Sequence, residues 1–278
     1  PPRSTLFPYT TLFRSFRQVL PARHSRVVRV PLVDYGMPPA EAAALADDGC
    51  FLLKIKIGGP GDRKTMLAAD MARLSELHDA LRDRKPEGAP GGRVMYYLDA
   101  NGRYESGDTL LRLLDHADRI GMLERIALLE EPYPENADIA VDALPVRVAA
   151  DESVHGPADV RARADMGYGA FAIKPAGKTL SVSLEVVREA AARGIPCFVA
   201  DSACVPLLAE WNKCVACRLP ALPGIGCGVL ESNGREHYAA WDRLTAEHAV
   251  PGAPWMTPRR GFFETGEPFY RVSGGIFR

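Results

Sequence analysis

The sequence predicts an α/β fold, a (β/α)8-type barrel that is (β/α)7β-like. From about residue 26, short apolar runs alternate with helix-like stretches through eight steps. Runs such as CFLLKIKI and VRVAA are rich in Val, Ile or Leu and lack a clean two-residue alternation, as is typical of parallel strands covered by helices. No G-x-G-x-x-G turn follows the first run, which argues against a dinucleotide-binding sheet. Eight such steps fit a barrel better than an open doubly wound sheet.

The elements follow in order along the chain. Strands are expected to begin near Val27, Phe51, Val94, Ile126, Val146, Ala170, Pro196 and Cys227. Amphipathic or helix-rich stretches between them predict helices within residues 38–49, 62–83, 106–122, 156–167, 179–194 and 207–219. Residues 84–93, RKPEGAPGGR, are rich in Gly and Pro and predict an inserted loop.

Composition excludes several classes of protein. The 278 residues carry a formal net charge of -1, so neither nucleic acid nor an anionic membrane surface is an expected partner. No apolar run approaches the roughly 20 residues that span a bilayer. The six cysteines are scattered in apolar runs, which indicates reduced thiols and a cytoplasmic location. The Cys214-x-x-Cys217 spacing has no second pair, so core packing is the preferred interpretation. A homo-oligomer is compatible with this composition.

Charged and polar residues stand at the ends of the predicted strands, which in such a barrel face the active-site mouth. In chain order they are Lys54 and Lys56, Asp99 and Asn101, Glu130 and Glu131, Asp151 and Glu152, Lys174, Asp201 and Glu231. An unpaired buried charge costs several kcal/mol, so these groups must pair with one another or with a metal ion.

Three of these carboxylates come from successive strands. Asp99, Glu130 and Asp151 are hard oxygen ligands, which together select Mg²⁺. Lys54 and Lys56 on one side and Lys174 on the other are expected to flank the same point. A lysine near a divalent cation and another ammonium group has a lowered pKa and can act as a base. The pattern therefore predicts removal of a proton α to a carboxylate, with the metal stabilising the resulting enediolate.

Five motifs carry a resemblance to a known family. KIKIG, YLDANG, LLEEP, ADES and IKPAG follow one another, and the gaps from Asp99 to Glu130, Asp151 and Lys174 are 31, 21 and 23 residues. In order and spacing they resemble the barrel domain of the enolase superfamily, the muconate-lactonizing/mandelate racemase-like C-terminal domain, over about Val27 to Glu231. The resemblance implies a modified TIM barrel and Mg²⁺ as the cofactor.

The resemblance also implies roles for single residues. Lysines on the second and sixth strands resemble the muconate-lactonizing subgroup, with Lys56 and Lys174 as acid/base groups on opposite faces of the substrate. Lys54 would hold the substrate carboxylate or tune Lys56. Glu130, Asp151 and Asp99 would be the metal ligands, and Glu131 and Glu152 would support them. Asn101, Asp201, Ser202 and Glu231 are assigned to substrate binding, although a helix cap is an alternative for Asp201 and Glu231. Lys178 is expected in solvent and His155 at the start of a helix.

The implied reaction leaves alternatives open. Two opposed lysines favour a racemase or epimerase that acts on a small-molecule carboxylate, while the same scaffold supports cycloisomerases and acid-sugar dehydratases. Dipeptide epimerases of the superfamily tend to carry Asp-x-Asp at the eighth strand, where this sequence has only Glu231 in CGVLESNG. A metal-binding but catalytically silent barrel is the alternative from another class.

The N-terminal residues predict a boundary of a different kind. Residues 5–15, TLFPYTTLFRS, resemble a widely used sequencing adapter translated in frame, so residues 1–15 are interpreted as non-native and 16–25 as a remnant of a linker or cap. The barrel is assigned to 26–235 and a C-terminal helix and tail to 236–278. The upstream α+β capping domain that the resemblance implies is expected to be missing. The aromatic residues of the tail are then expected to be exposed.

Overall fold

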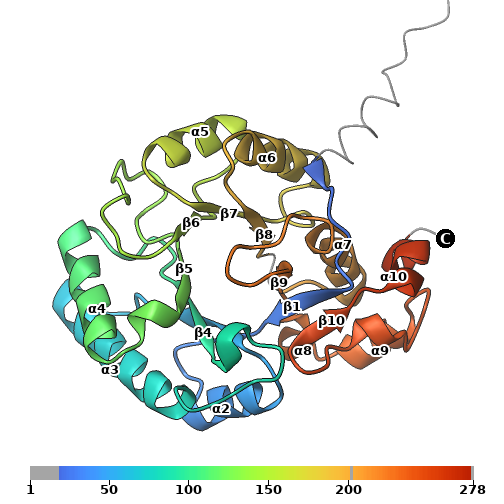
Figure 1. The fold of residues 1–278 in the computed structure, drawn as a ribbon, viewed down its shortest axis with the longest axis horizontal. Helices are drawn as coiled ribbons and strands as arrows, with labels where there is room; N and C mark the ends of the chain where they lie inside the picture. The colour runs from blue at the N-terminus through green and yellow to red at the C-terminus, as the bar shows by residue number, and fades with distance from the viewer. Residues whose placement is uncertain (1–18, 201–202, 277–278) are drawn as a thin grey trace, which may run out of the picture.

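The computed structural model of the protein describes residues 19–200 and 203–276. Its strands form a ring at the centre of the molecule, and helices surround that ring (Figure 1). This arrangement confirms the predicted α/β barrel, and each of the eight predicted strands is present within two residues of its expected start. The proposed adapter segment, residues 5–15, lies outside the described residues, as do Asp201 and Ser202.

Strands and helices alternate along most of the chain. The strands are β1 (Arg26–Val30), β2 (Leu32–Val33), β3 (Leu52–Lys56), β4 (Met95–Asp99), β5 (Ile126–Glu130), β6 (Val148–Ala150), β7 (Ala170–Ile173), β8 (Cys197–Val199), β9 (Gly228–Glu231) and β10 (Phe262–Glu264). The helices are α2 (Pro39–Asp47), α3 (Arg63–Leu81), α4 (Gly107–Arg119), α5 (Pro157–Asp165), α6 (Leu180–Ala192), α7 (Pro206–Ala216), α8 (Gly234–His237), α9 (Trp241–Ala246) and α10 (Glu267–Val272). Short 3₁₀ turns lie at Pro90–Gly92, Leu123–Arg125, Pro254–Met256 and Ser273–Gly275.

The barrel closes at a bend in its first strand. β1 pairs in parallel with β9, whereas β2 pairs in parallel with β3, and only Pro31 separates β1 from β2. The carbonyl of Pro31 accepts a hydrogen bond from the Lys54 amide at 3.0 Å. Because proline lacks an amide proton, it is tolerated where the strand changes partners. The remaining strands pair in parallel in chain order from β3 to β9, so all their C-terminal ends meet at one mouth.

Two apolar layers account for the strand sequences. Inside the ring, side chains such as Tyr97, Leu128 and Phe198 form one buried cluster. Tyr96 and Leu98, the neighbours of Tyr97 on β4, point outward and join the larger cluster between the sheet and the helices. A strand buried on both faces is apolar at successive positions, and this explains the runs without alternation.

Local signals set where the helices begin. The Asp62 side chain caps α3 by accepting from the amides of Lys64 and Thr65, and Ser106 caps α4 through the Thr109 amide. Between β5 and β6 the described chain, residues 131–147, forms turns and no helix. The ring of helices is therefore interrupted between α4 and α5 (Figure 1).

The C-terminal segment differs from the expectation of an exposed aromatic tail. β10 pairs antiparallel with β1, and α8 to α10 gather beside it at one side of the barrel (Figure 1). Phe262, Phe263 and Phe269 are at most 4% exposed. The prediction of exposed aromatics was wrong because Phe262 and Phe263 extend the sheet, Phe262 joins the cluster inside the ring, and Phe263 and Phe269 join the outer cluster. The sequence pattern of a short tail does not indicate this.

The Cys214–Cys217 pair belongs to the packing at the end of α7 in the described structure. Cys214 and Cys217 lie at the end of α7, and burial raises the pKa of the Cys214 thiol to about 12. Such a thiol stays protonated, which fits packing rather than redox or metal chemistry. Among the described residues, no helix combines the length and the apolar character that crossing a membrane requires.

Candidate active site at the barrel mouth

Polar side chains from six strand ends converge at the barrel mouth. β3, β4 and β5 end in register, with Lys56 opposite Asp99 and Asp99 opposite Glu130. Asp99, Glu130 and Asp151 are at most 1% exposed. The local reason is simple: each is the last residue of an apolar strand or the first residue after it, so the backbone carries it to the edge of the buried layer. The structure thereby brings together the groups that the sequence placed at strand ends.

Lys54 lies at the centre of the carboxylates. Its Nζ is 2.9 Å from Asp99 Oδ2, 3.1 Å from Glu130 Oε1 and 2.8 Å from Glu231 Oε2. The side chain is 4% exposed. Burial acts to lower the pKa of this ammonium group, but Glu130, Glu231 and Asp99 outweigh it and hold the pKa well above its ordinary value. Lys54 is therefore a buried charge partner for three strands, with all three of its protons directed at carboxylates.

Lys56, two residues after Lys54 on β3, also contacts Asp99. Its Nζ lies 2.5 Å from Asp99 Oδ2 and also donates to Asn101 Oδ1. Burial acts to raise the pKa of Asp99, but Lys54 and Lys56 outweigh it and lower that pKa. Asn101 has a φ of 43°, in the left-handed region, and its amide group donates to Glu152 Oε1 at 3.0 Å. Asn101 thus joins Lys56 to Glu152 across the mouth.

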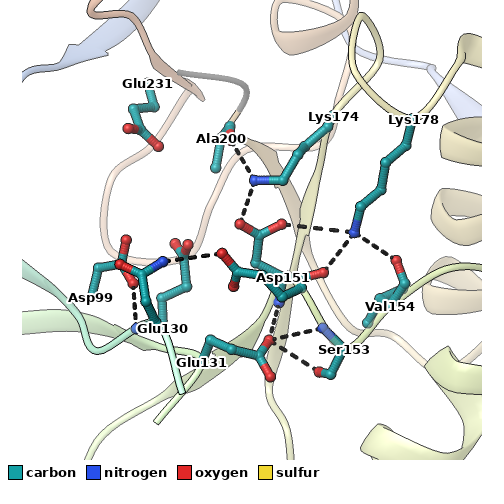
Figure 2. A network of polar contacts seen from close by, with 12 residues as sticks. Asp99, Glu130, Glu131, Asp151, Ser153, Val154, Lys174, Lys178, Ala200 and Glu231 are labelled. Atoms are coloured by element: carbon teal, nitrogen blue, oxygen red, sulfur yellow. Dashed lines mark hydrogen bonds and ion pairs between the residues drawn. The ribbon is translucent and has the colours of Figure 1, made fainter. Parts of the chain in front are cut away.

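Lys174 approaches from the other side of the ring, at the end of β7. Its Nζ donates to Asp151 Oδ2 and, at 3.1 Å, to the carbonyl of Ala200 (Figure 2). Burial acts to lower the pKa of Lys174, but Asp151 and Glu130 raise it above its ordinary value. β3 and β7 are separated by three strands on either side of the eight-stranded ring, so Lys56 and Lys174 project from opposite walls.

The expectation for Lys178 was wrong. Its Nζ donates to the carbonyls of Asp151 and Val154, both at 2.8 Å, and its side chain is 26% exposed. The sequence expectation of a solvated lysine failed because the loop after β7 folds back over the turn after β6. The spacing of Lys178, four residues beyond Lys174, is the one signal that would have placed it near the site.

Three carboxylates lie close enough to share a metal ion. Glu130, Asp151 and Glu152 each offer one oxygen atom, and these atoms all lie within 4.8 Å of one another. In the described part of the chain, Glu130 Oε2, Asp151 Oδ1 and Glu152 Oε2 are buried and accept no hydrogen bond. Buried carboxylate oxygens without donors are unfavourable, and a hard divalent cation is the partner that three of them suit.

The three-residue group differs from the predicted ligand set in one member. Asp99 Oδ2 is occupied by Lys54 and Lys56, and Asp99 Oδ1 accepts from the Asn101 amide at 3.0 Å. Glu152, which was expected only to support the ligands, stands in the group instead. Burial raises the pKa of the Glu152 carboxyl, and Asp151 and Asp99 raise it further. Asp99 remains a predicted ligand, and it shares Lys54 with Glu130.

Glu131 holds the turn that follows β6. Its Oε2 accepts from the Asp151 amide at 2.6 Å, from the Ser153 amide at 3.3 Å and from Ser153 Oγ at 3.0 Å (Figure 2). Glu131 has a φ of 36°, which turns its side chain away from that of Glu130 and under the next strand end. The two adjacent glutamates of LLEEP therefore face different partners.

Glu231 is committed to contacts within the protein. One carboxylate oxygen accepts from Lys54, and the other accepts from Asn233 Nδ2 at 2.9 Å. Asn233 in turn accepts from the Leu32 amide at 2.9 Å, which ties β9 to the bend that closes the barrel. A substrate-binding role for Glu231 stays a prediction. Asp201 and Ser202, assigned to the same role, lie outside the described residues.

A buried aspartate braces the loops that follow Lys56 and Asn101. Asp70, on α3, accepts from the Gly58 amide at 2.7 Å and from the Tyr104 hydroxyl at 2.6 Å. Gly58 has a φ of 77°, and Arg103 packs where a side chain would otherwise stand. Burial raises the pKa of the Asp70 carboxyl, although the donors from Tyr104 and Gly58 oppose this. Sequence reasoning missed Asp70 because nothing in the pattern of α3 distinguishes it from a surface aspartate.

Replacing Asp70 tests whether the brace acts through its hydrogen bonds or its charge. Asp70→Leu should lower the free energy of unfolding by about 2–4 kcal/mol, because two buried donors lose their acceptor. Asp70→Asn keeps an acceptor and should cost under about 1 kcal/mol at pH 7. A carboxyl whose pKa is raised by folding stabilises the protein below its unfolded pKa, and this contribution is lost as pH rises through the folded pKa. The free energy of unfolding of Asp70→Asn should therefore lie closest to that of the wild type at high pH. Urea unfolding at pH 5 and pH 8 measures both effects, and equal losses in the two variants would contradict the brace.

The fold and the site together define a class: a β/α barrel with lysines and carboxylates at successive strand ends. The sequence profile of the family described as "Enolase C-terminal domain-like" matches residues 39–232. The match covers most of the chain, and the protein belongs to this family. The resemblance drawn from the five motifs is thereby confirmed.

Individual relatives agree with this assignment. L-Lys-D/L-Arg epimerase of Methylococcus capsulatus is 35% identical over 141 residues, 49% of this chain and 34% of that protein. Two solved structures have a TM-score of 0.63, each covering 87% of this chain and 61% of the other. They are 2-chloromuconate cycloisomerase of Rhodococcus opacus, 23% identical, and a mandelate racemase/muconate lactonizing protein of Paracoccus denitrificans complexed with magnesium, 16% identical. At these identities the structures show the fold alone. The chain spans about a third (34%) of the length of the curated relative that it matches.

Proposed function

We propose that this barrel binds Mg²⁺ at its mouth and removes a proton α to the carboxylate of a small-molecule substrate. The observation that carries the proposal is the placement of Lys56 and Lys174 on opposite walls, with a group of buried carboxylates between them. Within the superfamily chemistry, the reaction best supported is 1,1-proton transfer by a racemase or epimerase of the muconate-lactonizing subgroup.

The donor set supports the choice of metal. Glu130 and Asp151 would hold the ion, with Asp99 as the third predicted ligand and Glu152 as the carboxylate next to them. Among the described residues of the site, the carboxylates of Asp99, Glu130, Asp151 and Glu231 contact the lysines Lys54, Lys56, Lys174 and Lys178. Within the described structure, buried oxygen atoms of Glu130, Asp151 and Glu152 still accept no hydrogen bond, and a divalent cation would give them a partner. When bound, Mg²⁺ supplies positive charge that stabilises the deprotonated carboxylate substrate.

The lysines supply the proton chemistry. Each Nζ is directed into the mouth from its own wall, so each can face a different side of one substrate carbon. One lysine would accept the α-proton, and the other would donate a proton to the opposite face. In the described structure, Asp151 and Glu130 raise the pKa of Lys174. If these carboxylates were neutralised by a bound divalent cation, they would raise the pKa of Lys174 less. The pKa would then lie closer to the range in which Lys174 can act as a base.

The choice of an epimerase over other superfamily reactions rests on two considerations. Opposed lysines are required for proton transfer between faces and are not required for a one-face elimination. In addition, the curated relative from Methylococcus capsulatus is an epimerase. The side chain that would recognise a cationic substrate at the last strand, Glu231, is already bonded to Lys54 and Asn233. We therefore propose the reaction class of that relative for this barrel and do not propose that it binds a cationic substrate.

Proton exchange in D₂O tests the proposal. The wild type with Mg²⁺ should exchange the α-proton of both stereoisomers of a substrate found in a library of N-acyl amino acids and dipeptides. Lys174→Ala should lose about 10²–10⁴-fold in exchange for one stereoisomer and keep exchange for the other, and Lys56→Ala should show the opposite preference. NMR follows the loss of each α-proton signal. The reciprocal pattern arises because each lysine serves only one face.

Two controls separate the lysines from the metal. Lys85→Ala, at an exposed lysine before β4 at the other end of the barrel, should exchange as the wild type does. Asp151→Asn should lose exchange for both stereoisomers and lose stabilisation by Mg²⁺, whereas Asp83→Asn, at a 93% exposed carboxylate, should keep both. Exchange that survives both lysine substitutions would exclude the two-lysine mechanism. No exchange with any acid, despite Mg²⁺ binding, would favour a silent barrel.

A further inference from the structure

The loop after β7 places a second lysine over the site. The Lys178 amide donates to the carbonyl of Lys174 at 2.7 Å, which forms a single helical turn between them. The next residue, Thr179, has a φ of 71° and a ψ of 151°. A β-branched residue rarely adopts a positive φ, and such conformations persist where surrounding contacts hold them. The contacts made by Lys178 hold this loop together with bonds from Ser183 to the Thr179 carbonyl and from the Ala176 amide to Asn212.

Lys178 binds the main chain of the neighbouring strand end. Its Nζ donates to the carbonyls of Asp151 and Val154, which are the first and last residues of the turn after β6. The same turn is closed by the Val154 amide, which donates to the Asp151 carbonyl at 3.1 Å. Lys178 Nζ is also 4.0 Å from Asp151 Oδ1, while Lys174 contacts Oδ2 (Figure 2).

The opposite side of the turn is held by a carboxylate. Glu131 Oε2 accepts from the amides of Asp151 and Ser153 and from the Ser153 hydroxyl. The turn from Asp151 to Val154 is thus clamped, with the ammonium group of Lys178 on its carbonyls and the carboxylate of Glu131 on its amides (Figure 2). The backbone of Asp151 is bonded on both sides without any contribution from Lys174.

We infer that Lys178 is a positioning residue that, together with Glu131, fixes the Asp151 turn so that Lys174 is free to exchange Asp151 for the substrate. The inference deepens the proposed function and rests on it for the role of Lys174. Lys178 is not a third acid/base group, because its ammonium protons are directed at two carbonyls and at the Asp151 carboxylate. To contact a substrate, Lys174 must break its bonds to Asp151 Oδ2 and to the Ala200 carbonyl. The clamp on the turn keeps Asp151 in place when these bonds break.

Hydrogen exchange of the metal-free protein tests the clamp without reference to activity. Lys178→Met keeps the aliphatic stem and removes the donors, and it should speed amide exchange in residues 151–154 at least tenfold. Lys178→Arg, which keeps the charge and donors, should restore most of the protection. Lys85→Met is the matched control and should leave exchange in this turn unchanged. Unchanged protection in Lys178→Met would overturn the inference.

Metal binding and turnover test the consequence. The Mg²⁺ concentration at the midpoint of thermal stabilisation should rise about 10–100-fold in Lys178→Met, as is usual when a support of a ligand is lost. Turnover number should fall with little change in KM, and Lys178→Arg should recover it. A metal-free melting temperature that falls in both variants alike, with an unchanged Mg²⁺ midpoint, would overturn the positioning role. If the wild type itself shows no Mg²⁺ stabilisation, the proposed function fails, whereas the hydrogen-exchange result still decides whether the clamp exists.

Discussion

Lys54→Met is expected to lower the free energy of unfolding by about 3–5 kcal/mol, measured by urea denaturation in EDTA. The substitution removes the ammonium group that contacts Asp99, Glu130 and Glu231 and leaves three buried carboxylates without it. Methionine has a similar stem, so the loss reflects charge and hydrogen bonding more than volume. Lys54 comes from β3, and its partners come from β4, β5 and β9. The substitution therefore removes contacts between strands on the two sides of β1 and β2, where the barrel closes.

The pH dependence of the wild type follows from the same contacts. The pKa of Lys54 is raised well above its ordinary value, so its contribution is fully present below the pKa of an unfolded lysine. It is lost only as pH rises through the folded value, beyond the neutral range. Stability should therefore carry no signature of Lys54 between pH 6 and 9. Lys85→Met, at an exposed site, should stay within about 0.5 kcal/mol of the wild type. A loss under about 1 kcal/mol in Lys54→Met would show that the carboxylates rearrange at little cost.

The strand order and the mouth of the barrel were predictable because parallel strands end on one side. An apolar run followed by a charged residue locates a strand end to within a residue or two, and consecutive strands in a barrel are neighbours. Lys56, Asp99 and Glu130 were therefore predicted to lie together, and they stand in register on three adjacent strands. The sequence pattern was sufficient for positions along the backbone.

Partners of individual side chains were less predictable because they depend on loop conformation and rotamers. Lys178 was expected in solvent and Glu152 only as a support of the metal ligands, yet Lys178 clamps the Asp151 turn and Glu152 lies beside Glu130 and Asp151. Asp70 and Glu210 sit on helices where only the packing of another segment makes them buried. β10 was missed for a related reason: three residues, FFE, carry too little periodicity to indicate a strand, and the antiparallel pairing with β1 comes from a distant part of the chain.

A buried ion pair on α7 provides the sharpest example of a feature that the sequence concealed. On α7, Lys213 Nζ lies 2.6 Å from Glu210 Oε1 and donates to the Trp255 carbonyl at 2.7 Å. The same Nζ lies 4.2 Å from the centre of the Phe263 ring. Lys213 and Glu210 are at most 2% exposed. Their spacing of three residues resembles an ordinary surface pair on a helix, but the C-terminal segment covers them.

Lys213→Met is expected to cost about 3–5 kcal/mol at pH 8, because it leaves the Glu210 carboxylate buried without its partner. The double variant Lys213→Met/Glu210→Leu should recover most of that loss, since an apolar pair of similar volume replaces the ion pair. Burial already raises the pKa of Glu210 despite Lys213, and the single variant removes the opposing cation. A carboxyl with a raised folded pKa stabilises the protein below its unfolded pKa and loses that contribution as pH rises, so the cost of Lys213→Met should shrink toward pH 4.

A double-mutant cycle by urea unfolding at pH 4 and pH 8 measures these terms, with Glu210→Leu as the fourth corner. A coupling energy above about 2 kcal/mol at pH 8 that falls at pH 4 is the expected result. Equal costs at the two pH values would mean that Lys213 acts by filling space beside Phe263, not by compensating Glu210. If the double variant is no more stable than Lys213→Met, the bond from Lys213 to the Trp255 carbonyl, and not the ion pair, is what holds the C-terminal segment against the barrel.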